Sequence, residues 1–103
     1  MTAAATREQA RRLLSELLRK DTVLCFPTAP FPAPDRDIDG PAAAALWPAI
    51  APLTCIAGLT GAPQLTVPLT RVGGRPVGLS LLGPPGSDGA LVTTATWLFG
   101  SDP

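Results

Sequence analysis

The stretch GLTGAPQLTVPLTRVGGRPVGLSLLG, residues 58–83, contains two apolar runs on either side of two adjacent glycines. Gln64–Leu69 and Val77–Leu82 have the length and composition of strands, so residues 64–82 are predicted to form two strands. Gly73 and Gly74 adopt positive φ angles easily, which a hairpin turn requires. The connection is longer than two residues, and this leaves the pairing partner of each strand open.

The first forty residues contain sequence patterns that predict a helix, a strand and a loop, in that order. Apolar residues at helical spacing follow Thr6, whose hydroxyl is the predicted N-cap of a helix over residues 7–20. Residues 22–26 are apolar on both faces and are stopped by Pro27, which predicts an interior strand of a covered sheet. Repeated prolines and charges over residues 27–41 predict an extended surface loop, favoured over a polyproline ligand for another domain.

Two short helices are predicted before the glycine-containing stretch. Pro41 suits the first helical position, and Pro48 is predicted to end that helix because proline lacks the N–H that the helix needs. A second helix is predicted over residues 53–59, with Gly61 in the left-handed conformation past its end.

The final predicted helix covers residues 88–99, with Ser87 as its N-cap. Leu91 and Ala95 belong to its apolar face, whereas Trp97 points away from that face at about 100° per residue. Trp97 is therefore either simply exposed or packed against a surface that this chain does not supply.

The composition limits the function classes. With 103 residues, the chain is one small domain or a piece of a larger one. Its eight basic and eight acidic residues cancel, so neither a nucleic acid nor an anionic membrane is an expected partner. No run reaches the roughly 18 apolar residues of a membrane span, and the first twenty residues do not resemble a secretory signal. The two cysteines, interpreted as reduced thiols, favour a cytoplasmic protein. The 46% hydrophobic content predicts apolar surface that remains exposed unless something covers it.

Residues able to bind metals or perform catalysis are scarce. The chain has no histidine, and its two cysteines, Cys25 and Cys55, are predicted to be buried reduced thiols rather than a disulfide, so no metal and no cofactor is expected. Lys20, the single lysine, stands at the polar end of a charged helix, where it is expected to be solvated. The pair Ser87-Asp88 is better explained as a helix cap with an acidic first turn than as a catalytic pair. None of the four serines has a predicted base as a neighbour; they are Ser15, Ser80, Ser87 and Ser101.

Several short motifs nevertheless follow one another in a characteristic order. They are Pro27-Thr28, Thr54-Cys55-Ile56-Ala57-Gly58-Leu59, Gly61-Ala62-Pro63, Gln64, Leu65-Thr66-Val67-Pro68, Arg75-Pro76-Val77-Gly78-Leu79 and Ser87-Asp88. Over residues 7–99 their order and spacing resemble the C-terminal part of the amidase signature family. The segment Thr54–Leu59 together with Gln64 is most similar to the indole-3-acetamide hydrolase type.

The resemblance implies a fold and a chemistry. The implied fold is α/β, a C-terminal fragment of the amidase mixed-sheet fold with about three strands and three to four covering helices. The implied chemistry is hydrolysis of carboxylic amides by a Ser–cis-Ser–Lys triad, whose residues have no counterpart in this chain. The resemblance also places four residues near the substrate side, where the alternative for each is core packing or capping: Thr28, Thr54, Cys55 and Gln64.

The sequence therefore predicts that residues 1–103 form the C-terminal portion of an amidase domain that is inactive alone. The predicted partner is a separate polypeptide carrying the catalytic part, or a second copy through self-association. The alternative is a non-catalytic remnant or small interaction protein that reuses the fold. Unbroken apolar stripes, such as Leu13–Leu18, favour the first hypothesis.

Overall fold

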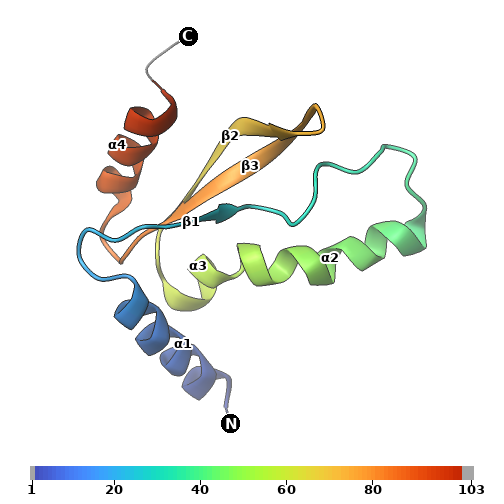
Figure 1. Ribbon diagram of the computed structural model, residues 1–103. Coiled ribbons are helices and arrows are strands. Elements are labelled where there is room, and N and C mark those ends of the chain that lie inside the picture. Colours follow the sequence, from blue (N-terminus) through green and yellow to red (C-terminus); the bar gives the residue numbers. More distant parts are fainter. Residues whose placement is uncertain (1, 101–103) are drawn as a thin grey trace.

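The computed structural model describes residues 2–100, and their chain order alternates helices and strands (Figure 1). The elements are α1 (Ala3–Leu17), β1 (Leu24–Pro27), α2 (Gly40–Thr54), α3 (Ile56–Thr60), β2 (Gln64–Val72), β3 (Arg75–Leu82) and α4 (Asp88–Phe99). The predicted α/β class, with three strands and up to four helices, is confirmed. The predicted bounds of α4 are also confirmed, whereas most other bounds move by a few residues.

The sheet has the order β1-β3-β2, and both pairs are antiparallel. Val72 pairs with Arg75, so the connection between β2 and β3 is a two-residue turn, shorter than predicted. Gly73 and Gly74 have φ angles of 58° and 79°, which confirms the predicted role of these glycines. The register shifts after Val67, where a proline follows in β2 and cannot donate a ladder hydrogen bond.

β1 is an edge strand within the described residues, and the central strand is β3. The prediction that the apolar run 22–26 is an interior strand is therefore wrong for this chain. The run fits an interior strand in composition, but only one side of β1 meets a partner here, through pairs such as Phe26 with Ser80.

α1 begins four residues earlier than predicted. Its N-cap is Thr2, whose hydroxyl accepts a hydrogen bond from the Ala5 N–H at 3.1 Å, and Thr6 instead donates its hydroxyl to the Thr2 carbonyl. The three alanines after Thr2 are the strongest helix formers, so the helix extends through them to the earlier cap. At the other end, Asp21 has a φ angle of 67°, which turns the chain towards β1.

α2 continues through both of its prolines, contrary to the predicted end at Pro48. Asp39 caps it by accepting the Ala42 N–H at 2.7 Å, and Pro41 lies in the first turn as predicted. Pro48 and Pro52 are both exposed, so the backbone carbonyls that lose an intrahelical partner can be hydrated by water. The second predicted helix shortens to α3, which ends at Gly61 with the predicted left-handed φ angle of 76°.

The main core lies where α1 and α3 meet one end of the sheet. Leu18, Ala62 and Leu82 are buried there, and Leu14 and Phe26 are among the partly buried residues that pack against them. α4 packs against β2 and β3. Its buried residue Leu91 lies next to Gly83, where an added Cβ would be 3.1 Å from Leu91 Cδ2.

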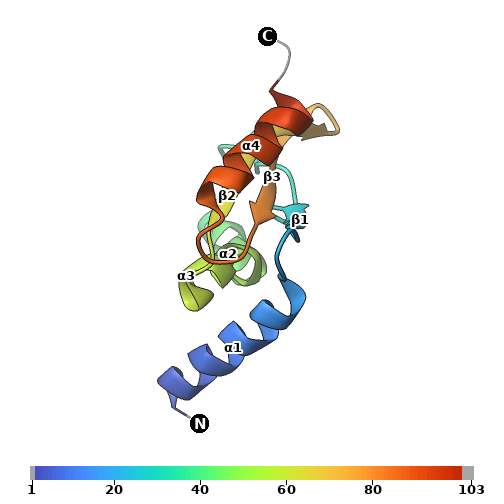
Figure 2. The ribbon, with the colours of Figure 1, turned by 90° about the vertical axis from the view of Figure 1, so that its left-hand side faces the viewer.

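The molecule is a thin plate in which the start of α1 and the end of α4 lie far apart (Figures 1 and 2). Its Cα atoms span 45 × 41 × 15 Å, and the radius of gyration of 15.7 Å exceeds the roughly 13 Å of a compact chain of this length. The predicted exposure of apolar surface is confirmed. Large exposed side chains include Leu13, Leu17, Trp47, Leu59, Val72, Val92, Trp97 and Leu98.

Trp97 is 79% exposed, which confirms that it points away from the packed face of α4. Ser87 occupies the N-cap position but makes no side-chain cap, because its hydroxyl donates to the Pro84 carbonyl at 2.6 Å. No helix among residues 2–100 combines the length and the apolar character that a membrane crossing requires.

Candidate functional site

A cluster of polar side chains lies on one face of the sheet, directly beside the main core. We call it the Ser80 cluster, and it comprises Thr28, Gln64, Thr66 and Ser80. Ser80 pairs with Phe26 of β1 and with Thr66 of β2, and side chains of directly paired residues share a face. Gln64 and Thr28 stand two residues from those partners, so strand periodicity places them on the same face.

The Ser80 hydroxyl is the centre of this cluster. Its residue is completely buried, at 0% exposure. Gln64 Nε2 donates a hydrogen bond to Ser80 Oγ at 2.9 Å, and Thr28 Oγ1 lies 2.7 Å from the same oxygen. Thr66 Oγ1 is further away, at 3.4 Å. Because Ser80 Oγ accepts from Gln64, its own proton is available to a threonine hydroxyl, and the buried hydroxyl is fully satisfied.

Gly78 provides the space in which the two threonines approach the sheet. A Cβ at this position would lie 2.9 Å from both Thr28 Oγ1 and Thr66 Cγ2, closer than real Cβ atoms come to such neighbours. The Gly78 carbonyl also accepts the Thr28 N–H at 2.8 Å, which extends the pairing of β1 and β3 to Thr28. A glycine is therefore required for close approach, as is common in strand interiors next to other groups.

Of the four predicted substrate-side residues, the structure brings Thr28 and Gln64 together and leaves the other two apart. Thr54 Oγ1 makes a long bond of 3.4 Å back to the Ile50 carbonyl within α2, which is a local helix contact. Cys55 stands exposed at the junction of α2 and α3. Both cysteines are free, as predicted, but exposed, so the prediction of buried thiols is wrong. Cys25 alternates with the core residues of β1 and therefore lies on the outer face of an edge strand.

Sequence reasoning missed Ser80 and Thr66 as members of the site. The available signal was alternation, since Gln64 and Thr66 alternate with leucine and valine, and Ser80 stands between two leucines. Two strands joined by a hairpin place such polar residues side by side. Because the sequence left the pairing of the two strands open, this proximity could not be predicted.

The Ser80 cluster contains hydroxyl and amide groups and no side chain that titrates near neutral pH. It can bind or orient a polar group, but it offers no base to activate a nucleophile. Of the remaining serines, Ser15 donates to the Arg12 carbonyl and Ser87 to the Pro84 carbonyl, while Ser101 lies outside the described residues. Nowhere between residues 2 and 100 do three or more metal-binding side chains converge.

Comparison with known protein families identifies the family of this chain. The family model described as Amidase matches residues 1–92, almost the whole chain. The chain belongs to the amidase family. A solved structure titled "Crystal structure of amidase" superposes on 92% of this chain with a TM-score of 0.70 and 32% sequence identity. Fold and sequence therefore agree, and the chain is an amidase segment whose residues 2–100 form four helices and a small antiparallel sheet.

Two curated proteins are also similar to this amidase segment. One is outer envelope protein 64, mitochondrial, of Arabidopsis thaliana, 30% identical over 96 residues, which are 92% of this chain. The other is one of the subunits of the glutamyl-tRNA(Gln) amidotransferase of Methanothermobacter thermautotrophicus, 51% identical over 41 residues, or 40% of this chain. The chain spans 16% of the first protein, 9% of the second and 23% of the solved amidase chain.

Proposed function

We propose that residues 1–103 supply the C-terminal segment of an amidase that hydrolyses carboxylic amides. In this proposal the catalytic Ser–Ser–Lys residues lie on polypeptide outside these residues, which we call the completing polypeptide, and the chain alone is inactive. The carrying observation is the superposition on 92% of this chain but only 23% of a solved amidase. The relative from Methanothermobacter is by name one subunit of a larger assembly, which supports a role in completing an enzyme.

The Ser80 cluster gives this segment a role beyond packing. A buried serine that fixes Thr28 and Gln64 presents their remaining hydrogen-bonding capacity from a rigid sheet. We place these two side chains in the wall of the acyl pocket, with Thr54 and Cys55 as further lining once the completing polypeptide is present. Hydroxyl and amide groups suit this position, because an uncharged amide substrate is recognised by neutral hydrogen bonds.

The proposed substrate class is that of the indole-3-acetamide hydrolases. The similarity of Thr54–Leu59 and Gln64 to that type supports this choice. The balanced charge of the chain and its apolar surface support a cytoplasmic enzyme whose partner is protein, rather than nucleic acid or membrane.

The test is reconstitution of amide hydrolysis. The completing polypeptide of the same source, recognised by a Gly-Gly-Ser-Ser loop with an upstream lysine, is expressed with and without residues 1–103. Ammonia release from indole-3-acetamide is then measured, with the loop serines changed to alanine as the control. We expect hydrolysis only when both parts are present, and equal rates with and without residues 1–103 would contradict the proposal.

A non-catalytic interaction protein that reuses the amidase fold is the second candidate. The Arabidopsis relative favours it, because that protein is named for an organelle envelope and not for amide hydrolysis. The two candidates are separated by isolating the native complex of the chain and measuring its amide hydrolysis. A stable complex without any amide hydrolysis supports the interaction protein, whereas hydrolysis by the complex supports the enzyme.

A further inference from the structure

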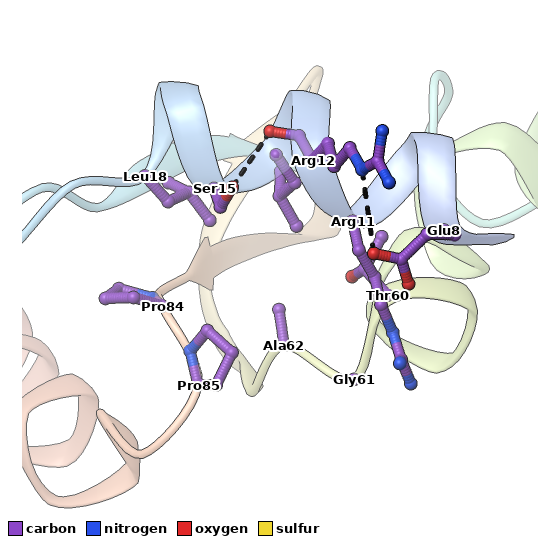
Figure 3. A pocket seen from close by; sticks show the side chains of 11 residues that line it. Glu8, Arg11, Arg12, Ser15, Leu18, Thr60, Gly61, Ala62, Pro84 and Pro85 are labelled. Carbon is purple, nitrogen blue, oxygen red and sulfur yellow. Dashed lines mark hydrogen bonds and ion pairs between the residues drawn. The ribbon is translucent and has the colours of Figure 1, made fainter.

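A groove runs along one side of α1, between this helix and the two loops that enter β2 and leave β3 (Figure 3). We call it the α1 groove. Its volume is about 540 Å³, within the range of roughly 300–1,000 Å³ that is usual for ligand sites. It is lined by Glu8, Arg11, Arg12, Leu14, Ser15, Leu18, Thr60, Gly61, Ala62, Pro84 and Pro85.

The floor of the α1 groove is apolar, and one charged group at its rim has no partner. Among the described residues Arg11 makes neither an ion pair nor a hydrogen bond. Its side chain extends from α1 past Thr60 and Gly61 (Figure 3). An added Cβ at Gly61 would lie 3.8 Å from the terminal Nη2 of Arg11. The neighbouring Arg12 is already 3.7 Å from Glu8. Arg11 therefore offers a free guanidinium, with five N–H donors, above an apolar surface.

The uncharged polar side chains near Arg11 are already hydrogen-bonded to backbone carbonyls of their own helices. Ser15 donates its hydroxyl to the Arg12 carbonyl at 2.9 Å, and Thr60 donates its hydroxyl to the Ile56 carbonyl at 2.7 Å. An occupant of the groove that covers Arg11 must supply the acceptor itself. A carboxylate fits best, because it can accept two parallel N–H bonds from a guanidinium.

The exposed leucines of α1 favour a polypeptide over a small carboxylate as the occupant. A second, apolar groove lies on the other side of α1, lined in part by Leu13, Leu17, Ile56 and Leu59. Leu13 and Leu17 are 62% and 56% exposed, which is unusual for leucines on a helix that packs on a core through its other leucines. A small molecule in the α1 groove would leave this surface in water, whereas a protein can cover both sides of the helix.

We propose that the α1 groove receives a segment of the completing polypeptide in which an aspartate or glutamate is flanked by large apolar residues. The acidic side chain pairs with Arg11, and the apolar ones lie on Leu18, Ala62 and the two prolines. The inference rests on the proposed function, since this chain corresponds to only 23% of the solved amidase chain and the remainder is available to cover α1. The excess of arginine over acidic residues on α1 complements an acidic segment.

The first test is the affinity of the full chain for the completing polypeptide. Arg11→Glu is expected to raise the Kd roughly 30-fold, because it places a like charge against the acidic segment. Arg36→Glu is the matched control, since Arg36 is also exposed but stands in the loop between β1 and α2. It is expected to change the Kd less than about twofold, as for a charge outside the contact. Far-UV circular dichroism of the free chains verifies that both variants keep their helices.

The second test identifies the acidic partner directly. Arg11→Lys introduces an amine that a carbodiimide can link to a carboxylate in contact with it. Peptide mapping is expected to find a new cross-link from this position to an aspartate or glutamate of the completing polypeptide, absent from the wild-type complex and from Arg36→Lys.

The outcomes separate this inference from the proposed function. Tight binding and full hydrolysis by Arg11→Glu would overturn the docking of an acidic segment while leaving the proposed function intact. A cross-link from Arg36→Lys but not from Arg11→Lys would do the same. Failure of the wild-type chain to bind the completing polypeptide at all would overturn both. Displacement of the completing polypeptide by millimolar indole-3-acetate would contradict the inference, because it assigns the α1 groove to a small carboxylate.

Discussion

Replacing Gly78 with alanine tests whether the sheet and the Ser80 cluster fit as tightly as the structure indicates. The new methyl group would lie 2.9 Å from Thr28 Oγ1 and 2.9 Å from Thr66 Cγ2. Thr28 directly follows β1 and Thr66 lies in β2, so both side chains are attached to segments that flank β3. Thr28 is also held by the hydrogen bond from its N–H to the Gly78 carbonyl. The methyl group can be accommodated only if Thr28 rotates away from Ser80 or the strands separate slightly.

The free energy of unfolding should fall by about 2 kcal/mol. Inserting a methyl group into a filled space costs about 1–3 kcal/mol, and losing the bond between Thr28 and Ser80 costs about 1 kcal/mol more. Against this, alanine restricts the unfolded chain and contributes about 0.4–1 kcal/mol to stability. For a chain of this length, a loss of about 2 kcal/mol lowers the Tm by about 8–16 °C.

Urea unfolding followed by far-UV circular dichroism is the appropriate assay, because both tryptophans are exposed and report poorly on packing. Gly89→Ala is the matched control, since no atom lies within 4 Å of its added Cβ and alanine favours helix α4. Adding Thr66→Ser to Gly78→Ala removes one of the two close contacts and should restore part of the stability. A Gly78→Ala chain as stable as wild type would refute the reasoning.

Three further predictions follow from single contacts. Ser80→Ala should lower the free energy of unfolding, measured in urea, by about 1–2 kcal/mol, because two hydrogen bonds to a fully buried hydroxyl are lost. An unchanged free energy would mean that a water molecule replaces the hydroxyl. Asp39→Ala should remove the cap that accepts the Ala42 N–H and cost about 1 kcal/mol, with reduced helical signal in circular dichroism. Cys25 and Cys55 should both react with a thiol reagent in the native chain, and protection of either until unfolding would contradict its exposure.

The sequence predicted the elements whose signals are local. Gly61, Gly73 and Gly74 adopt positive φ angles where glycine was expected to allow them, and α4 has the predicted bounds. Each of these depends on a few adjacent residues. The prediction that Pro48 ends a helix failed, because an exposed proline in a helix costs stability without preventing the next turn.

The candidate site was only half predictable, because its contacts join distant residues. Thr28 and Gln64 were named from the resemblance to amidases, but Ser80, which connects them, lies 52 residues from the first and 16 from the second. Its membership follows from the antiparallel register of three strands, which no local pattern specifies. The prediction that Cys25 and Cys55 are buried failed for a related reason. Apolar neighbours in the sequence do not determine which face of a helix or strand is covered.

The 15 Å thickness of the plate also determines which mutations this sequence tolerates. In so thin a body few side chains can be distant from both surfaces. The buried apolar residues among those that the structure describes are correspondingly few, and they include Leu81, Leu82 and Leu91. A complete substitution scan of the chain alone would find intolerance at such positions and indifference at Leu13 or Trp97. The same scan inside a functioning enzyme would find both the buried positions and the exposed apolar positions sensitive. The positions that are sensitive only in the enzyme would define the surface that natural selection preserves for contact with another polypeptide.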